Sequence, residues 1–275
     1  MTEDGHGAAL RGGGIAWSHA ALRAVAARLS GVFAYHGVHP GEAVAFHGLN
    51  SPWQVATVLA ARILGARVVP LNWRLAPDEL QWAVEDAEVR VLIQGAQPGA
   101  KLRAPVVLDE AALSPADATP LREARDLSAT LLHAYTSGTT GRPKGALLTA
   151  DAFDANTRHG ISLFGLTRAD RVLTVLPLFH VGGLCIQTMP ALAAGAEVLL
   201  HPRFDADAFF DAVERDRPTL SLLVPAVMQA LVGHPRWDRA DLSSLRAVAP
   251  GRPTCRCISS RPFRHAAFPC SRSTA

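Results

Sequence analysis

The sequence has 275 residues, of which 49% are hydrophobic and 19% are charged, and its formal net charge is +3. This length can bury a substantial core as one large or two small domains, and the composition excludes wholesale disorder. The charge is too small to indicate a nucleic-acid-binding protein. No apolar run follows a positive start, and the longest apolar stretch, residues 53–71, is interrupted by Arg62 and Arg67. We therefore expect no secretory signal and no membrane span. Since Cys185 is the one cysteine before the last 25 residues, a cytoplasmic location is expected.

Helical and strand-like patterns alternate along most of the chain. Apolar spacing predicts a helix over residues 18–34, and Ser51-Pro52 predicts the start of another that ends at Leu64. Pro77 is predicted to open a third helix. Further helices are predicted at residues 151–163, 183–194, 206–215 and 226–232. Strands are predicted at residues 43–46, 68–71, 89–93, 106–108, 130–135, 172–175, 198–200 and 220–224. This order favours an α/β fold with largely parallel sheets flanked by helices.

One segment, YTSGTTGRPKG from Tyr135 to Gly145, carries the strongest chemical signal. It follows a predicted strand and holds three Gly, four Ser or Thr hydroxyls, and Lys144, one of only two lysines. Gly allows backbone shapes that direct several N–H groups into one concavity, and the hydroxyls add further donors. Lys144 adds a mobile positive charge. These groups suit a polyphosphate and the charge that grows on a leaving pyrophosphate.

Two other interpretations of this loop fit less well. A Walker loop needs adjacent Gly and Lys followed by Ser or Thr, whereas Arg142 and Pro143 separate Gly141 from Lys144 here. A flexible surface linker would account for the Gly, Ser and Thr content. It would not account for this particular order of residues directly after a predicted strand.

The string YTSGTTGRPKG resembles the signature loop of the adenylate-forming superfamily, which includes acyl-CoA synthetases, peptide-synthetase adenylation domains and luciferases. Three other segments are similar to the same family: residues 39–80, LPLFHVGGL at 176–184, and DLSSLRAVAPG at 241–251. The resemblance runs from about residue 8 to residue 251 and is strongest to acyl-CoA synthetases, including fatty-acid–CoA ligases. It implies that residues 1–250 are a partial AMP-binding N-terminal domain.

The resemblance also implies roles by position. The residues that match the loop handling the ATP phosphates are Thr136, Ser137, Gly138, Thr139, Thr140, Gly141 and Lys144. Phe179-His180 matches an aromatic–His pair that borders the acyl pocket and the tunnel, so Lys144 and His180 are the candidate catalytic residues. Peptide-synthetase domains usually carry Phe-Asp near this region, which favours a plain carboxylic acid over an amino acid. Because Asp205, Asp207 and Asp211 are expected to cap and solvate one helix, no metal-ligating residue is assigned.

The implied reaction has two steps and uses ATP, coenzyme A and Mg²⁺ besides the acid. A carboxylate attacks the α-phosphate of ATP and pyrophosphate leaves, and the thiol of coenzyme A then takes the acyl group from the adenylate. Mg²⁺ normally assists the first step.

The family pattern stops after Pro250-Gly251. A Gly-Tyr-Gly-x-Thr-Glu motif, a ribose-binding Asp and a C-terminal domain with a catalytic Lys are expected from the resemblance and are absent from the 275 residues. Residues 251–275 instead hold five Arg, no acidic residue and three of the four Cys. A zinc site at Cys255, Cys257, His265 and Cys270 is disfavoured by the C-x-C spacing. A back-translation shifted by two nucleotides can yield PAHLPVHLIEAFPARGIPLLQVHG, which has the expected turn, helix and strand. We therefore interpret residues 251–275 as a frameshifted or disordered tail.

These observations predict an acid–CoA ligase that is present as an incomplete fragment and is inactive alone. Two alternatives stay open: a non-catalytic fragment that binds a nucleotide or a partner, and a half-enzyme that needs a complementing chain. A general P-loop NTPase is a more distant third.

Overall fold

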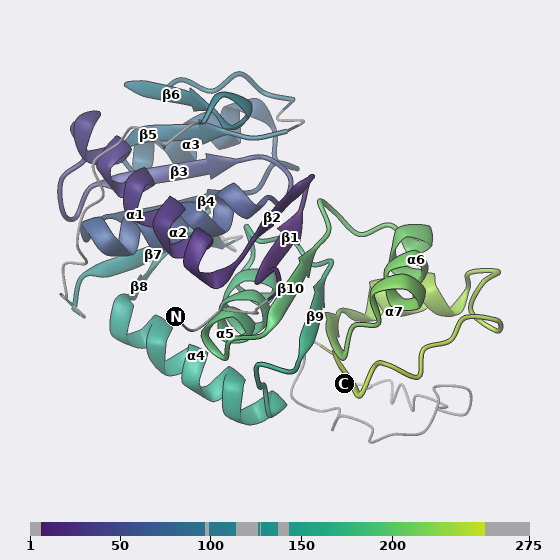
Figure 1. The fold of residues 1–275 in the computed structure, drawn as a ribbon. Helices are drawn as coiled ribbons and strands as arrows, with labels where there is room; N and C mark the ends of the chain where they lie inside the picture. The colour runs from purple at the N-terminus through teal and green to yellow at the C-terminus, as the bar shows by residue number, and fades with distance from the viewer. Residues whose placement is uncertain (1–6, 97–98, 114–125, 127, 137–142, 251–275) are drawn as a thin grey trace, which may run out of the picture.

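A computed structural model describes residues 7–96, 99–113, 126, 128–136 and 143–250. It has two six-stranded sheets with helices packed on them (Figure 1). The two sheets are largely parallel, which confirms the predicted α/β class. The tail at 251–275 lies outside the described residues, so the division of the chain at residue 250 stays a prediction.

The first sheet, called sheet I, has the strand order β6-β5-β3-β4-β7-β8. Its neighbours are parallel except β7 and β8, which form an antiparallel hairpin. Every residue of β3 is buried, as expected for a strand covered on both faces. The strands are β3 (Ala43–His47), β4 (Arg67–Leu71), β5 (Val89–Gln94), β6 (Val106–Asp109), β7 (Thr130–Thr136) and β8 (Lys144–Thr149).

The second sheet, sheet II, has the order β12-β11-β9-β10-β1-β2. It is parallel apart from the short β1–β2 hairpin at one edge. Strand β1 therefore joins a sheet whose other parallel strands all come from the second half of the chain. The strands are β1 (Leu10–Gly12), β2 (Ile15–Trp17), β9 (Arg171–Thr174), β10 (Glu197–Leu200), β11 (Leu220–Leu223) and β12 (Ala247–Pro250).

Local signals in the sequence explain where the helices begin and end. Ser51 accepts a hydrogen bond from the backbone of Trp53 at the start of α2, Pro52 takes the first helical position, and Gly65 ends the helix with a φ of 75°. Thr149 caps α4 in the same way. The helices are α1 (His19–Tyr35), α2 (Pro52–Leu64), α3 (Pro77–Asp86), α4 (Ala150–Phe164), α5 (Met189–Ala193), α6 (Ala206–Asp216) and α7 (Pro225–Val232).

One large core and one small core hold the layers together. The large cluster takes side chains from both sheets and from α1, α2, α4 and α6. The small cluster lies on the opposite face of sheet I, beneath α3. In Figure 1, α1 and α2 lie on one side of sheet I, and α6 and α7 lie near β9 at the far end of the molecule.

Three features differ from the sequence-based expectation. The short strands β1 and β2 and the edge strand β8 were not predicted, because a three-residue strand has no periodicity to detect and the first four residues of β8 are exposed. The helix predicted at residues 183–194 is a π-helix at Gly182–Thr188 followed by α5. In the π-helical turn, Thr188 donates its hydroxyl to the Gly183 carbonyl at 2.7 Å. Within the described residues, no helix is both long and apolar enough to cross a bilayer.

Candidate functional site

The β7–β8 hairpin holds the two ends of the Gly-rich loop side by side. Thr136, the last residue of β7, is paired with Lys144, the first residue of β8. The Thr136 hydroxyl donates to the Lys144 carbonyl at 3.3 Å. Ser137, Gly138, Thr139, Thr140 and Gly141 lie outside the described residues, so their predicted phosphate-binding role stays a prediction. The hairpin fixes where that loop leaves and rejoins sheet I.

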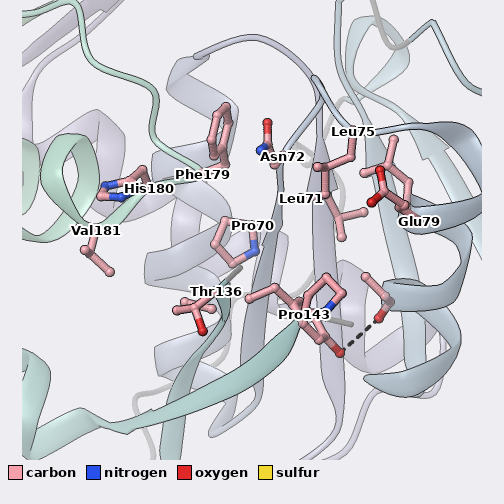
Figure 2. A pocket seen from close by; sticks show the side chains of 14 residues that line it. Pro70, Leu71, Asn72, Leu75, Glu79, Thr136, Pro143, Phe179, His180 and Val181 are labelled. Atoms are coloured by element: carbon pink, nitrogen blue, oxygen red, sulfur yellow. Dashed lines mark hydrogen bonds between the residues drawn. The ribbon is translucent and has the colours of Figure 1, made fainter. Parts of the chain in front are cut away.

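A cavity of about 440 Å³ lies beside this hairpin. Phe179, His180 and Val181 line one side of it (Figure 2). The opposite side belongs to the end of β4 and the start of α3, and the third side to the residues flanking the Gly-rich loop. The remaining labelled side chains are Pro70, Leu71, Asn72, Leu75, Glu79, Thr136 and Pro143. The structure therefore brings the Phe-His pair and the loop flanks, more than 30 residues apart in the chain, to one space.

The imidazole of His180 is oriented by its own backbone turn. Its Nδ1 accepts a hydrogen bond from the Gly182 N–H at 3.1 Å. In the neutral ring, Nδ1 is then the acceptor, so the proton sits on Nε2. The side chain of His180 is exposed and lines the cavity. This leaves the Nε2–H as a hydrogen-bond donor for a group that enters the cavity.

Two positive charges lie near the cavity. The Arg74 guanidinium lies 5.0 Å from the ring centroid of Trp73 and 5.7 Å from that of Phe179. Both distances are within the range of cation–π attraction. Lys144 is exposed, and no described residue forms an ion pair with it. The carboxylate of Glu79 lines the cavity as well, so the cavity has charged groups of both signs in or near it.

Tyr135 anchors the strand that leads into the Gly-rich loop. Its hydroxyl donates to the Asp86 carboxylate at 2.6 Å, and it lies 3.3 Å from the Ala83 carbonyl. Burial and the hydrogen bond to Asp86 raise the pKa of Tyr135, so the phenol stays a neutral donor. The ring also packs edge-on against Trp82 at 5.6 Å. These contacts fix the end of β7 against α3.

A buried amide anchors the segment that carries Phe179 and His180. Asn50 donates to the carbonyls of Leu176 and His201, and it accepts from the Leu178 N–H. We assigned no role to Asn50 from the sequence. A single signal was available there: an isolated amide between a buried strand and a Ser-Pro helix start.

The predicted role of the three aspartates at α6 is confirmed in part by direct contacts. Asp205 accepts from the Ala208 N–H at the helix start, and Asp207 and Asp211 form ion pairs with Arg236. In the part of the chain that the structure describes, no group of three or more His, Cys, Asp or Glu side chains is arranged to hold a metal ion.

Comparison with known proteins identifies one family of enzymes. Residues 2–260 match the family described as AMP-binding enzyme. An indoleacetate–CoA ligase of Aromatoleum aromaticum is 44% identical over 257 residues, covering 85% of this chain and 50% of the relative. A feruloyl-CoA synthase of Amycolatopsis is 41% identical over 251 residues, covering 90% and 51%. The chain thus spans about half the length of these curated relatives.

Solved structures agree with the sequence relatives. The inhibitor-bound N-terminal domain of FACL13 from Mycobacterium tuberculosis superposes with a TM-score of 0.82 at 26% identity, covering 91% of this chain and 67% of that one. ATP-bound MatB from Rhodopseudomonas palustris gives a TM-score of 0.78 at 26% identity, covering 91% and 52%. The fold described above is therefore that of the N-terminal domains of adenylate-forming enzymes.

Proposed function

Because the chain belongs to the family of AMP-binding enzymes, we propose that residues 1–250 form the phosphate-binding and acid-binding part of an ATP-dependent acid–CoA ligase. The observation that carries this proposal is the shared cavity. His180 and Phe179 face it from one side, and Thr136 and Pro143, which flank the Gly-rich loop, face it from another. A substrate held there would lie next to the loop.

The proposed substrate is an aromatic carboxylic acid. The relatives at 44% and 41% identity are named for indoleacetate and ferulate, and a third, at 33% identity, for 2-succinylbenzoate. Each of these acids joins an aromatic ring to a carboxylate. The cavity is lined mainly by apolar side chains, and its polar lining residues are Asn72, Glu79, Tyr135, Thr136 and His180. An apolar space with few polar groups suits such a molecule.

In the proposed first step, a carboxylate oxygen of the acid forms a bond to the α-phosphorus of ATP, and the bond from that phosphorus to the pyrophosphate oxygen breaks. The negative charge moves onto the leaving pyrophosphate. The backbone N–H groups and hydroxyls of residues 136–141, with the Lys144 ammonium, would stabilise this charge. His180 would donate its Nε2–H to a carboxylate oxygen and orient it for attack.

In the proposed second step, the sulfur of coenzyme A forms a bond to the acyl carbon, and the bond from that carbon to the AMP oxygen breaks. The thiol proton is released to solvent. The charge of Arg74 near the cavity would favour the approach of an anionic cosubstrate. Mg²⁺, when bound, would neutralise phosphate charge and would arrive with ATP, and no step here depends on a protein metal site.

The 275-residue chain is proposed to bind ATP without completing the reaction. It contains no Gly-Tyr-Gly-x-Thr-Glu motif, which the family resemblance links to adenine and magnesium. A binding fragment and a half-enzyme then differ in one respect, because only the half-enzyme gains activity when the missing groups are supplied.

Acid-dependent exchange of pyrophosphate into ATP tests both parts of the proposal. The purified chain is expected to show no exchange. A chimera that continues residues 1–250 with the matching C-terminal half of the indoleacetate–CoA ligase is expected to exchange with indoleacetate or ferulate. Exchange by the purified chain would contradict its proposed inactivity. A folded chimera that used only amino acids, or no acid at all, would refute the ligase assignment.

A further inference from the structure

Asn50 lies where the two sheets meet. It follows β3 of sheet I and directly precedes the Ser51 cap of α2. The residue is only 7% exposed. Its backbone N–H donates to the Pro202 carbonyl at 3.0 Å, just beyond the end of β10 in sheet II. A polar side chain at such a buried junction is stable only when its hydrogen bonds are satisfied.

The side chain of Asn50 makes three hydrogen bonds, all to backbone groups of the sheet II half. Its Nδ2 donates to the Leu176 carbonyl at 2.9 Å and to the His201 carbonyl at 3.0 Å. Its Oδ1 accepts from the Leu178 N–H at 2.7 Å. No hydrophobic or acidic side chain of the same size supplies two donors and an acceptor. Two of the three bonds go to Leu176 and Leu178, which lie within three residues before Phe179.

Other contacts hold the rest of the segment 176–183 in place. The His180 N–H donates to the Pro177 carbonyl at 3.2 Å, and the Gly182 N–H donates to His180 Nδ1 at 3.1 Å. On the other side, a Cβ placed on Gly183 would lie 2.5 Å from the Pro177 carbonyl oxygen and 2.8 Å from that of Leu176. The segment 176–183 is thus held between the Asn50 amide and a glycine backbone in close contact.

We propose that Asn50 is a positioning residue: its amide fixes the backbone at Leu176 and Leu178, and thereby sets the orientation of the His180 imidazole at the cavity. The consequence for catalysis rests on the proposed function, since the orientation of His180 matters for chemistry only if the acid binds beside it. The link from Asn50 to His180 is itself independent of any ligase activity. Asn50 is not one of the residues that line the cavity, and its side-chain hydrogen bonds go to backbone groups, so its effect is transmitted through the backbone.

Amide hydrogen exchange in the 275-residue chain tests this link. A purely structural role would change stability as a whole, so all amides that exchange by global unfolding would accelerate by a common factor. Val198, in the middle of sheet II, provides that reference. In Asn50→Ala, the amides of Leu178 and Gly182 are expected to accelerate at least tenfold beyond the factor seen at Val198. Equal acceleration at all three amides would overturn the proposal.

A matched control and a spectroscopic signature sharpen the test. Asn156 also donates its amide to this region, to the Cys185 carbonyl at 2.6 Å, but beyond His180. In Asn156→Ala, exchange at Leu178 and Gly182 is expected to accelerate only by the factor seen at Val198. The ¹⁵N resonances of the His180 ring, assigned by their loss in His180→Gln, are expected to show an unprotonated Nδ1 in the unmodified chain and in the control. They are expected to lose this signature in Asn50→Ala, and an unchanged ring spectrum there would overturn the proposal.

A second variant separates the two donors of Asn50 from its acceptor and is made alongside Asn50→Ala. Asn50→Asp keeps an acceptor for the Leu178 N–H and removes both donors, so Gly182 is expected to accelerate while Leu178 stays protected. If neither variant folds, the unmodified chain decides. Leu178 is expected to exchange as slowly as Val198, and rapid exchange at Leu178 would show that the Asn50 bond does not hold the turn.

Discussion

Thr136 and Lys144 face each other across the β7–β8 hairpin, and the Thr136 hydroxyl donates to the Lys144 carbonyl at 3.3 Å. The pair closes the base of the Gly-rich loop, so the Lys144 side chain starts from a fixed point at the loop edge. Its ammonium is exposed and forms no ion pair with a described residue. It is therefore available to an anionic ligand.

Replacing this lysine should weaken ATP binding. A hydrogen bond to a charged group contributes about 1.5–3 kcal/mol, so Lys144→Ala is expected to raise the Kd for ATP by roughly 10- to 100-fold. Isothermal titration calorimetry measures the change. Lys101→Ala is the matched control, since Lys101 is the other lysine of the chain, is exposed and lies outside the β7–β8 hairpin. An equal loss in both variants would point to general electrostatics rather than to a contact at the loop.

Stability should depend on pH through His47. This side chain is completely buried, and neither ring nitrogen has a hydrogen-bond partner in the described part of the chain. Burial lowers the pKa of His47 below its ordinary value of 6.5. The neutral ring is therefore favoured in the folded state, and its contribution is retained above pH 6.5 and lost as the pH falls through the lowered value. His133 and His201 also have pKa values lowered by burial, and they act in the same direction.

The variant His47→Leu separates this residue from the others. Removing two unpaired buried nitrogens is expected to stabilise the chain by about 1–2 kcal/mol at pH 7.5, with a larger gain at pH 5.5. Urea unfolding at the two pH values measures the difference. His39→Leu, at an exposed position, is expected to change neither value. A gain for His47→Leu that stayed the same at both pH values would exclude titration of this ring.

Gly183 should not tolerate a methyl group. A Cβ there would lie 2.5 Å from the Pro177 carbonyl oxygen, so the π-helical turn must shift to accept it. Gly183→Ala is expected to destabilise the chain by about 1–3 kcal/mol, as overpacking does elsewhere. At Gly233, the nearest atom to an added Cβ is 3.4 Å away, so Gly233→Ala should stay within about 0.5 kcal/mol. Thermal denaturation compares the two, and equal effects would argue against the tight turn.

Tyr135→Phe should loosen the strand before the loop. The hydroxyl donates to the exposed Asp86 carboxylate at 2.6 Å, and losing this bond is expected to cost about 1 kcal/mol. The chain has one other tyrosine, Tyr35, which is 87% exposed, so Tyr35→Phe is the control. Chemical denaturation of both variants checks the prediction. A variant at Tyr135 as stable as the control would mean that the Asp86 contact does not stabilise the hairpin.

Much of the architecture could be predicted from local pattern. Helix α2 was placed from Ser51-Pro52 to Leu64, and the structure has the same boundaries, because a cap, a first-turn Pro and a terminal Gly coincide. Strand β8 could not be predicted, since KGALLT has neither alternation nor a buried run. The partition into two sheets was also inaccessible, because strand pairing depends on contacts between residues far apart in sequence.

Some residues of the candidate site could likewise be predicted from the sequence, and others could not. Thr136, Lys144 and His180 were identified from sequence strings, and the structure places Thr136 and His180 on one cavity. Their roles stay predictions. Asn50 could not be identified, because its importance lies in three backbone partners located more than 120 residues further along the chain. A pattern within one segment contains no information about such partners.

The position of β1 has a consequence for the order in which the protein can fold during synthesis. Leu10 pairs with Val198, and the side chains of Arg11 and Glu197 meet 186 residues apart. All strands of sheet I are made by residue 149, whereas β1 must wait for β10 to leave the ribosome. At typical translation rates of about 5–20 residues per second, that wait lasts roughly 10–40 seconds. During this interval β1 can pair with β2 alone of its two neighbouring strands, so the edge that β10 will cover is open to pairing with other chains.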